Sequence, residues 1–163
     1  MSGIGSSEPC ATGVVEVYLL DTNHCSFILE GEPTVIENFR SRANVKIATS
    51  VIVAGELKFM VHNSQQRTAN LIKIQAFLQR IEVYPIDLAI ANIYGEFKAE
   101  LIREFGPKQR SRRKTTRLVE LGMSENDLWI AATALCHSLT IVSSDSDFER
   151  MRQVREFNLE SWV

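Results

Sequence analysis

Short, mostly apolar runs alternate with longer amphipathic stretches over most of this chain, and no other feature limits the fold as strongly. The runs at 17–20, 46–48 and 139–142 are too short for helices, so we interpret them as buried strands. In the longer stretches apolar residues recur at helical spacing, notably over 51–62, 66–80 and 125–137. Strands that alternate with helices predict an α/β fold with a mostly parallel central sheet.

Capping and turn residues define several element boundaries. A helix is expected after Pro33, and further short strands are expected near 83–85 and 158–161. Residues that prefer the N-cap position precede three of the predicted helices: Ser124, Asp87 and either Thr49 or Ser50.

Composition indicates one globular domain. The 163 residues are 45% hydrophobic and 23% charged, which excludes general disorder. Residues 1–13 are small and polar and are predicted to form a flexible tail, which leaves 14–163 as a single domain. No apolar stretch approaches the roughly 20 residues of a membrane span. The cysteines have no metal-binding spacing and are expected to be free thiols in a reducing cytoplasm: Cys10, Cys25 and Cys136.

A basic insert over 106–123 interrupts the pattern, because this connection is long and has no strong apolar period. The rest of the chain holds 12 of the 18 lysines and arginines but all 20 acidic residues. Three interpretations remain open for the insert: a surface that binds phosphates, a solvated loop, or a docking site for an acidic partner. Its basic side chains are Lys108, Arg110, Arg112, Arg113, Lys114 and Arg117.

Four acidic positions are candidates for chemistry. Asp21 and Asp145 follow two predicted strands, and sites in parallel sheets form beyond the carboxyl ends of strands. Glu56 interrupts an apolar line on helix 51–62, and Asp127 lies in the first turn of helix 125–137 on its apolar face. Asp147 is close to Asp145 in the sequence and competes with it for the same role.

These carboxylates lack basic partners at helical spacing on the same faces. At about 5 Å each pair would repel by about 3 kcal/mol at an effective dielectric of about 20. Such a cluster either holds protons at raised pKa or binds a cation, and all-oxygen ligands favour Mg²⁺ or Mn²⁺. A hard divalent ion can polarise a phosphate and activate water, which is the chemistry of phosphodiester hydrolysis.

Each acid also has a structural interpretation. Glu56 could lie at the rim of the fold, and Asp127 could form a capping box with Ser124. The others are placed to cap helices or close turns: Asp21, Asp145 and Asp147. The order and local context of all the acids together favour a site over these separate roles.

Four blocks in this order resemble PIN-domain ribonucleases, in particular VapC-type toxins of toxin–antitoxin pairs. The blocks are VYLLDTN at 17–23, ATSVIVAGEL at 48–57, NDLWIAA at 126–132 and LTIVSSDSDF at 139–148. The ending at 159–162 is similar to the closing strand of that family, so the resemblance covers about 16–162. It implies an α/β/α sandwich around a mostly parallel sheet.

The resemblance also implies an active site and partners. The family's main acids fall on Asp21, Glu56 and Asp127, and its fourth acid falls on Asp145 or Asp147. Asn23 matches a small polar residue near the site, and Ser143 keeps the hydroxyl of the family's usual threonine. Members hydrolyse RNA with Mg²⁺ or Mn²⁺, often form homodimers, and are neutralised by a VapB-like antitoxin. Apolar surface on helices near 51–81 is the expected dimer face.

The resemblance therefore predicts a cytoplasmic, metal-dependent ribonuclease that uses one or two ions. The basic insert departs from the short link of many VapC-type chains, and its place just before Asp127 favours RNA contact. A phosphotransferase with Asp21 as nucleophile is one alternative, although the usual DxD opening is missing. A non-catalytic RNA-binding module with the same fold is the other. His24 and His137 lie in no triad context and are interpreted as ordinary helix residues.

Overall fold

A five-stranded parallel sheet forms the centre of the protein. The computed structural model describes residues 15–42 and 44–163. The strand order is β3-β2-β1-β4-β5, with every neighbouring pair parallel, so β1 is central. The strands are β1 (Glu16–Leu20), β2 (Val45–Ser50), β3 (Glu82–Tyr84), β4 (Thr140–Val142) and β5 (Leu159–Glu160). The predicted parallel α/β class is confirmed.

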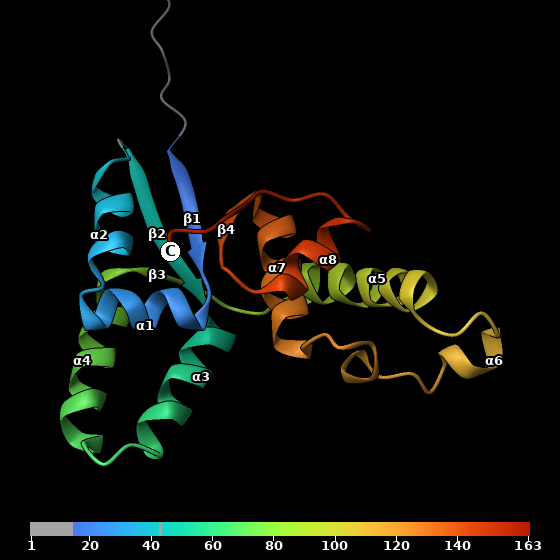
Figure 1. The fold of residues 1–163 in the computed structure, drawn as a ribbon, viewed down its shortest axis with the longest axis horizontal. Coiled ribbons are helices and arrows are strands. Elements are labelled where there is room, and N and C mark those ends of the chain that lie inside the picture. Colours follow the sequence, from blue (N-terminus) through green and yellow to red (C-terminus); the bar gives the residue numbers. More distant parts are fainter. Residues whose placement is uncertain (1–14, 43) are drawn as a thin grey trace, which may run out of the picture.

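Helices connect successive strands and flank the sheet. Figure 1 shows α1 to α4 gathered around β1 to β3, whereas α5, α7 and α8 pack together beside β4. The helices are α1 (Thr22–Glu30), α2 (Pro33–Arg40), α3 (Val51–His62), α4 (Arg67–Arg80), α5 (Leu88–Phe105), α6 (Arg110–Arg113), α7 (Glu125–His137) and α8 (Ser146–Arg152). A 3-10 turn, η1 (Leu118–Leu121), precedes α7. In the parts of the chain that the structure describes, no helix is long and apolar enough to cross a membrane.

Helix caps lie where the sequence predicts them. Ser50, Asp87 and Ser124 accept hydrogen bonds from the first turns of α3, α5 and α7. Asp21 caps α1 and Asp145 caps α8 in the same way. Three of these helices begin directly or shortly after β1, β2 and β4, so their N-termini gather at the carboxyl edge of the sheet.

The core lies along the central strands. Leu19 and Leu20 of β1 and Ile141 and Val142 of β4 are fully buried, as their continuous apolar runs predict for a covered parallel sheet. Trp162 is buried as well, but it packs on Tyr18 of the central strand, with ring centroids 5.2 Å apart. The expectation that Trp162 covers the sheet edge is therefore wrong. The chain crosses back over the sheet after β5.

The basic insert forms an arm that leaves the body at the end of α5 and returns at α7, with α6 near its tip (Figure 1). Leu118 and Met123 anchor the returning strand of the arm in the core. Arg113 folds the outer part, because its guanidinium donates to the carbonyls of Pro107 and Lys108 at 2.8 and 3.1 Å. The predicted N-terminal tail over 1–13 lies outside the described residues.

Candidate active site

The carboxyl edge of the sheet brings four separate segments together. Asp21 directly follows β1, and Ser143 directly follows β4, the neighbouring parallel strand. Asp145 and Asp147 open α8, and Asp127 lies in the first turn of α7. Glu56 lies on α3, which begins immediately after β2. The sheet order therefore collects residues that are far apart in the sequence.

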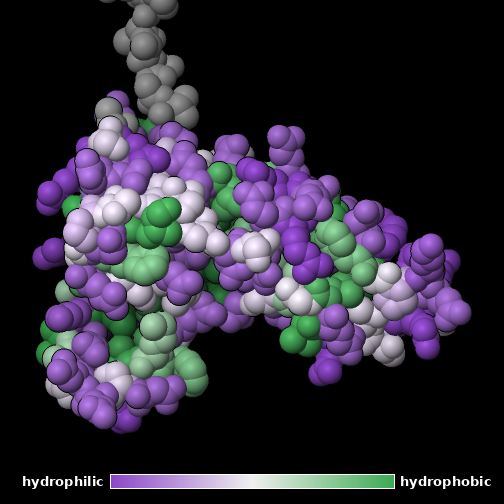
Figure 2. All heavy atoms as spheres, viewed as in Figure 1, coloured by the Kyte–Doolittle hydropathy of each residue, from purple (hydrophilic) through white to green (hydrophobic). Residues whose placement is uncertain are grey.

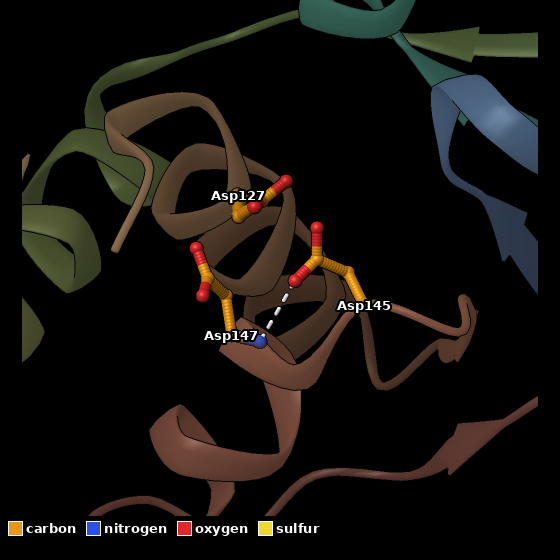
Figure 3. Close-up of side chains that lie close together, drawn as sticks. All are labelled: Asp127, Asp145 and Asp147. Carbon is orange, nitrogen blue, oxygen red and sulfur yellow. Dashed lines mark hydrogen bonds between the residues drawn. The ribbon is translucent and has the colours of Figure 1, made fainter. Parts of the chain in front are cut away.

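Three aspartates converge most closely. One carboxylate oxygen from each of Asp127, Asp145 and Asp147 lies within 4.8 Å of the other two. Figure 3 shows the side chain of Asp127 on α7 directed toward those of Asp145 and Asp147 at the start of α8. Asp145 is exposed and the other two are half-buried. The arrangement leaves carboxylate oxygens accessible on one side while the protein excludes water from the other.

Electrostatic crowding changes the acidity of Asp127. Burial raises the pKa of this carboxyl to about 7, and the charges of Asp145, Asp147, Glu56 and Asp21 raise it further. In the structurally described part of the chain, no lysine or arginine forms an ion pair with any of these five acids. The site therefore presents an excess of negative charge, which favours a proton or a cation.

Asp21 is held on both of its oxygens. Oδ1 accepts hydrogen bonds from the backbone N–H of His24 at 2.8 Å and lies 3.0 Å from Nδ1 of the same residue. Oδ2 accepts from the hydroxyl of Ser143 at 2.5 Å. The same Ser143 oxygen accepts from the backbone N–H of Asp145 at 3.0 Å. Ser143 thus links Asp21 to the aspartate cluster, as the hydroxyl predicted at this position would.

Glu56 is held by two neighbours of the acids. The Thr22 hydroxyl donates to Oε2, and the Asn126 amide donates to Oε1 at 2.7 Å. Thr22 follows Asp21 and Asn126 precedes Asp127, so the Glu56 carboxylate bridges the ends of α1 and α7. The interpretation of Glu56 as a separate rim residue does not fit these contacts.

The capping interpretation of Asp127 can now be weighed. Ser124 accepts from the backbone N–H groups of Asn126 and Asp127, so it does cap α7. However, the backbone N–H of Ser124 donates to Asp147 at 2.9 Å, which replaces the return bond that Asp127 would make in a capping box. Asp147 therefore supports the helix, and the Asp127 carboxylate remains directed into the cluster.

The structure differs from the sequence-based site at a few positions. Asn23 is exposed, and within the described residues its side chain makes no hydrogen bond to the site. Thr22 and Asn126 hold Glu56 instead, and only their adjacency to predicted acids could have indicated this. The interpretation of His24 as an ordinary helix residue is wrong, because it is fully buried against Asp21.

The donor chemistry of the site fits a hard cation. The converging ligand atoms are all carboxylate oxygens, which Mg²⁺, Mn²⁺ and Ca²⁺ prefer over softer nitrogen or sulfur donors. Glu56 and Asp21 each already accept hydrogen bonds on both oxygens, so their positions are set in advance. A preset cluster of this kind is able to bind a divalent ion without a large rearrangement.

Comparison with known proteins gives the family. The PIN domain family matches residues 18–154. Ribonuclease VapC2 of Haemophilus influenzae is 30% identical over 148 residues, which cover 90% of this chain and 98% of that protein. Ribonuclease VapC2 of Rickettsia felis is 29% identical over 148 residues, with 90% and 98% coverage. The chain therefore belongs to the PIN-domain family, among the proteins related to VapC ribonucleases.

Solved structures agree with this assignment. The chain is similar to the VapBC complex of Salmonella typhimurium bound to DNA, with a TM-score of 0.72, 26% identity, and coverage of 91% of this chain and 99% of that one. It is also similar to VapBC2 of Rickettsia felis bound to a promoter DNA fragment, with a TM-score of 0.70, 26% identity, and coverage of 90% and 99%. Both likenesses extend over nearly the whole neighbouring chain.

Proposed function

We propose that this protein is a metal-dependent ribonuclease, the toxin of a VapBC-type pair. The observation that carries the proposal is the convergence of Asp127, Asp145 and Asp147 within 4.8 Å, with Asp21 and Glu56 joined to them through hydrogen bonds. The VapC relatives named as ribonucleases support the same reaction. Phosphodiester hydrolysis needs a centre that concentrates a cation beside water and phosphate, and this cluster has that chemistry.

The five acids have different parts in this proposal. Asp21 and Asp127 are the main ligands of Mg²⁺ or Mn²⁺, and Glu56 and Asp145 complete the ligand set or orient the attacking water. Asp147 is the competing fourth acid, and its bond to the Ser124 backbone favours Asp145 for direct contact. When bound, one or two such ions lower the pKa of water and offset charge that builds on the phosphate. In-line attack leaves a 5′-phosphate and a 3′-hydroxyl.

The basic arm binds the RNA strand in this proposal. Four of its basic side chains are exposed and make no ion pair in the described structure: Lys108, Arg110, Arg112 and Lys114. Arg117 is paired loosely with Glu120 at 3.7 Å, and Arg113 folds the arm. Lysine and arginine contacts to phosphates give affinity that does not depend on base sequence and falls with salt. The arm would therefore hold substrate while the acids cleave it.

Two protein partners are part of the proposal. Structural neighbours are complexes named VapBC, which supports a VapB-like antitoxin that binds this chain. A homodimer is supported by exposed apolar side chains on α3 and α4, where Figure 2 shows hydrophobic residues gathered at the surface. They are Val51, Phe59, Met60 and Ile72. A toxin of this class would act on RNA in the cytoplasm.

The alternative in which Asp21 is a phosphotransferase nucleophile fits the geometry less well. The Asp21 side chain is only 7% exposed, and both of its oxygens accept hydrogen bonds. A nucleophilic oxygen has to be free to attack phosphorus. The alternative of a non-catalytic RNA-binding module leaves the preset carboxylate cluster without a purpose.

The direct test is cleavage of defined RNAs by the purified protein, with 5′ and 3′ ends mapped. Cleavage is expected with Mg²⁺ or Mn²⁺ and not with chelator, and the products should carry 5′-phosphates. An Asp21→Asn protein purified in the same way controls for contaminating nucleases. Tight RNA binding without cleavage in Mn²⁺ would instead support the non-catalytic alternative, and a trapped phospho-aspartate would support the phosphotransferase.

A further inference from the structure

We infer that His24 is a positioning residue that fixes the rotation of the Asp21 carboxylate from behind. This inference rests on the proposed role of Asp21 as a metal ligand. His24 has no exposed surface, and its two ring nitrogens contact different partners. Nδ1 lies 3.0 Å from Oδ1 of Asp21, and Nε2 lies 3.3 Å from the backbone nitrogen of Trp162.

The contact with Trp162 determines which ring nitrogen carries hydrogen. A backbone N–H is only a donor, so Nε2 of His24 has to accept with its lone pair. In the neutral ring the hydrogen is then on Nδ1, which donates to Oδ1 of Asp21. A backbone group at the C-terminus thereby sets the direction of a hydrogen bond at the proposed metal site.

The result is a carboxylate with three fixed donors. Oδ1 of Asp21 accepts from the backbone and the ring of His24, and Oδ2 accepts from Ser143. Two of these donors belong to groups that cannot move easily, because the backbone N–H is part of α1 and the ring is buried. Removal of the ring donor would leave the carboxylate freer to rotate away from the position that a cation needs.

The donor at Trp162 is itself held firmly. Its carbonyl accepts from the Asn38 amide at 3.2 Å, and its indole N–H donates to Glu160 at 3.0 Å. The guanidinium of Arg42 lies 4.9 Å from the centre of the indole ring and donates to Glu160 at 2.7 Å. The segment after β5 is therefore a rigid support that reaches Asp21 through His24.

Packing and hydrogen bonding by His24 can be separated experimentally. The ring makes an edge-to-face contact with Phe27, with centroids 5.6 Å apart and planes at 81°, and a phenyl ring would keep that contact. His24→Phe therefore keeps an aromatic ring but removes both nitrogens. His24→Asn loses the ring but places an amide donor near the position of Nδ1.

The first measurement is Mn²⁺ affinity by electron paramagnetic resonance, together with kcat and KM for a defined RNA. In His24→Phe we expect Mn²⁺ affinity and kcat to fall about 10-fold or more, the usual range for residues that orient metal ligands. KM for RNA should stay within about twofold, and His24→Asn should recover most of the loss. Equal losses in both variants, or wild-type Mn²⁺ affinity in His24→Phe, would overturn the inference.

The second measurement needs no variant and no activity. Long-range ¹H–¹⁵N NMR correlations of the histidine rings in the metal-free protein report which nitrogen carries hydrogen. We expect His24 to show the Nδ1–H tautomer, and an Nε2–H ring would contradict the inference even in an active enzyme. Failure of the wild type to bind Mn²⁺ or cut RNA would instead overturn the proposed function, so the two failures are distinguishable.

Discussion

The hydroxyl of Ser143 donates to Oδ2 of Asp21 at 2.5 Å, although the two residues are 122 positions apart in the sequence. The same oxygen accepts from the backbone N–H of Asp145 at 3.0 Å. One buried hydroxyl therefore joins the end of β1 to the loop between β4 and α8. This contact is possible because β1 and β4 are adjacent and parallel.

Ser143→Ala should lower RNA cleavage about 10-fold while leaving the fold intact. The variant loses one of the donors that orient Asp21, and orienting residues of metal ligands contribute about 10–100-fold to activity or affinity. Ser143→Thr keeps the hydroxyl and should retain most of the activity. Initial rates at saturating Mn²⁺ would show this, and equal rates for Ala and Thr would refute the role of the hydroxyl.

Asp21→Asn should lower metal-dependent cleavage by at least about 100-fold, which equals about 2.7 kcal/mol of transition-state stabilisation. The amide keeps the size of the side chain but removes the negative charge that the proposed ion requires. The fold should survive, because the amide oxygen can still cap α1. Circular dichroism and end-mapped cleavage together test this, and full activity in a clean preparation would exclude the assignment.

Asp127→Asn should stabilise the metal-free protein at pH 8 but not near pH 4. The folded-state pKa of Asp127 is about 7, above its ordinary value of 3.8, because of burial and neighbouring acids. Between these values the folded protein binds a proton that the unfolded chain has lost, so stability falls as pH rises through this range. The variant cannot ionise there and should escape that loss.

Thermal unfolding in chelator from pH 4 to pH 8 would measure this difference. We expect the Asp127→Asn midpoint to exceed the wild-type midpoint by a few degrees at pH 8, with convergence near pH 4. Glu104→Gln, at an exposed position on α5, should shift the midpoint by the same small amount at every pH. A constant difference for Asp127→Asn would mean that its pKa is not raised.

Charge reversal on the basic arm should weaken RNA binding without changing the chemical step. For Arg110→Glu with Arg112→Glu we expect KM to rise about 10-fold at moderate salt, kcat to stay constant, and the salt slope to fall by about 0.7 per lost contact. Arg40→Glu with Arg80→Glu changes charge equally at exposed sites on α2 and α4 and is the control. An unchanged KM would favour a solvated loop, and loss of binding to an acidic protein would favour a docking surface.

The apolar surface of α3 and α4 should control oligomeric state. Phe59 is 69% exposed and Ile72 is 62% exposed, and such side chains are usually covered by a partner when they cluster. Phe59→Ser with Ile72→Ser should shift a homodimer to monomers in light scattering after gel filtration. Val119→Ser, at an equally exposed apolar position on the arm, should leave the mass unchanged.

Local patterns were sufficient for most of the fold. The runs at 17–20 and 139–142 predict β1 and β4 because only a strand covered on both faces is so short and so apolar. Ser50, Asp87 and Ser124 mark helix starts because their side chains satisfy free backbone N–H groups within the next three residues. Such signals depend on a few neighbouring residues, so the sequence alone contains them.

Contacts across the sheet could not be predicted in this way. Nothing near Asn126 in the sequence shows that its amide binds Glu56, 70 positions away, and nothing near His24 points to the backbone of Trp162, 138 positions away. The choice of Asp147 over Asp127 as the partner of the Ser124 backbone is also invisible locally. Each depends on the order of strands in the sheet.

The sequence by itself therefore determined the strands, the helices and the identity of the acids, because these follow from short-range periodicity, capping and residue type. Only the tertiary structure decided which oxygens meet, which donors hold them, and how far the pKa of Asp127 rises. The physical reason is that burial and charge repulsion depend on distances between side chains, and those distances exist only once the parallel sheet has assembled.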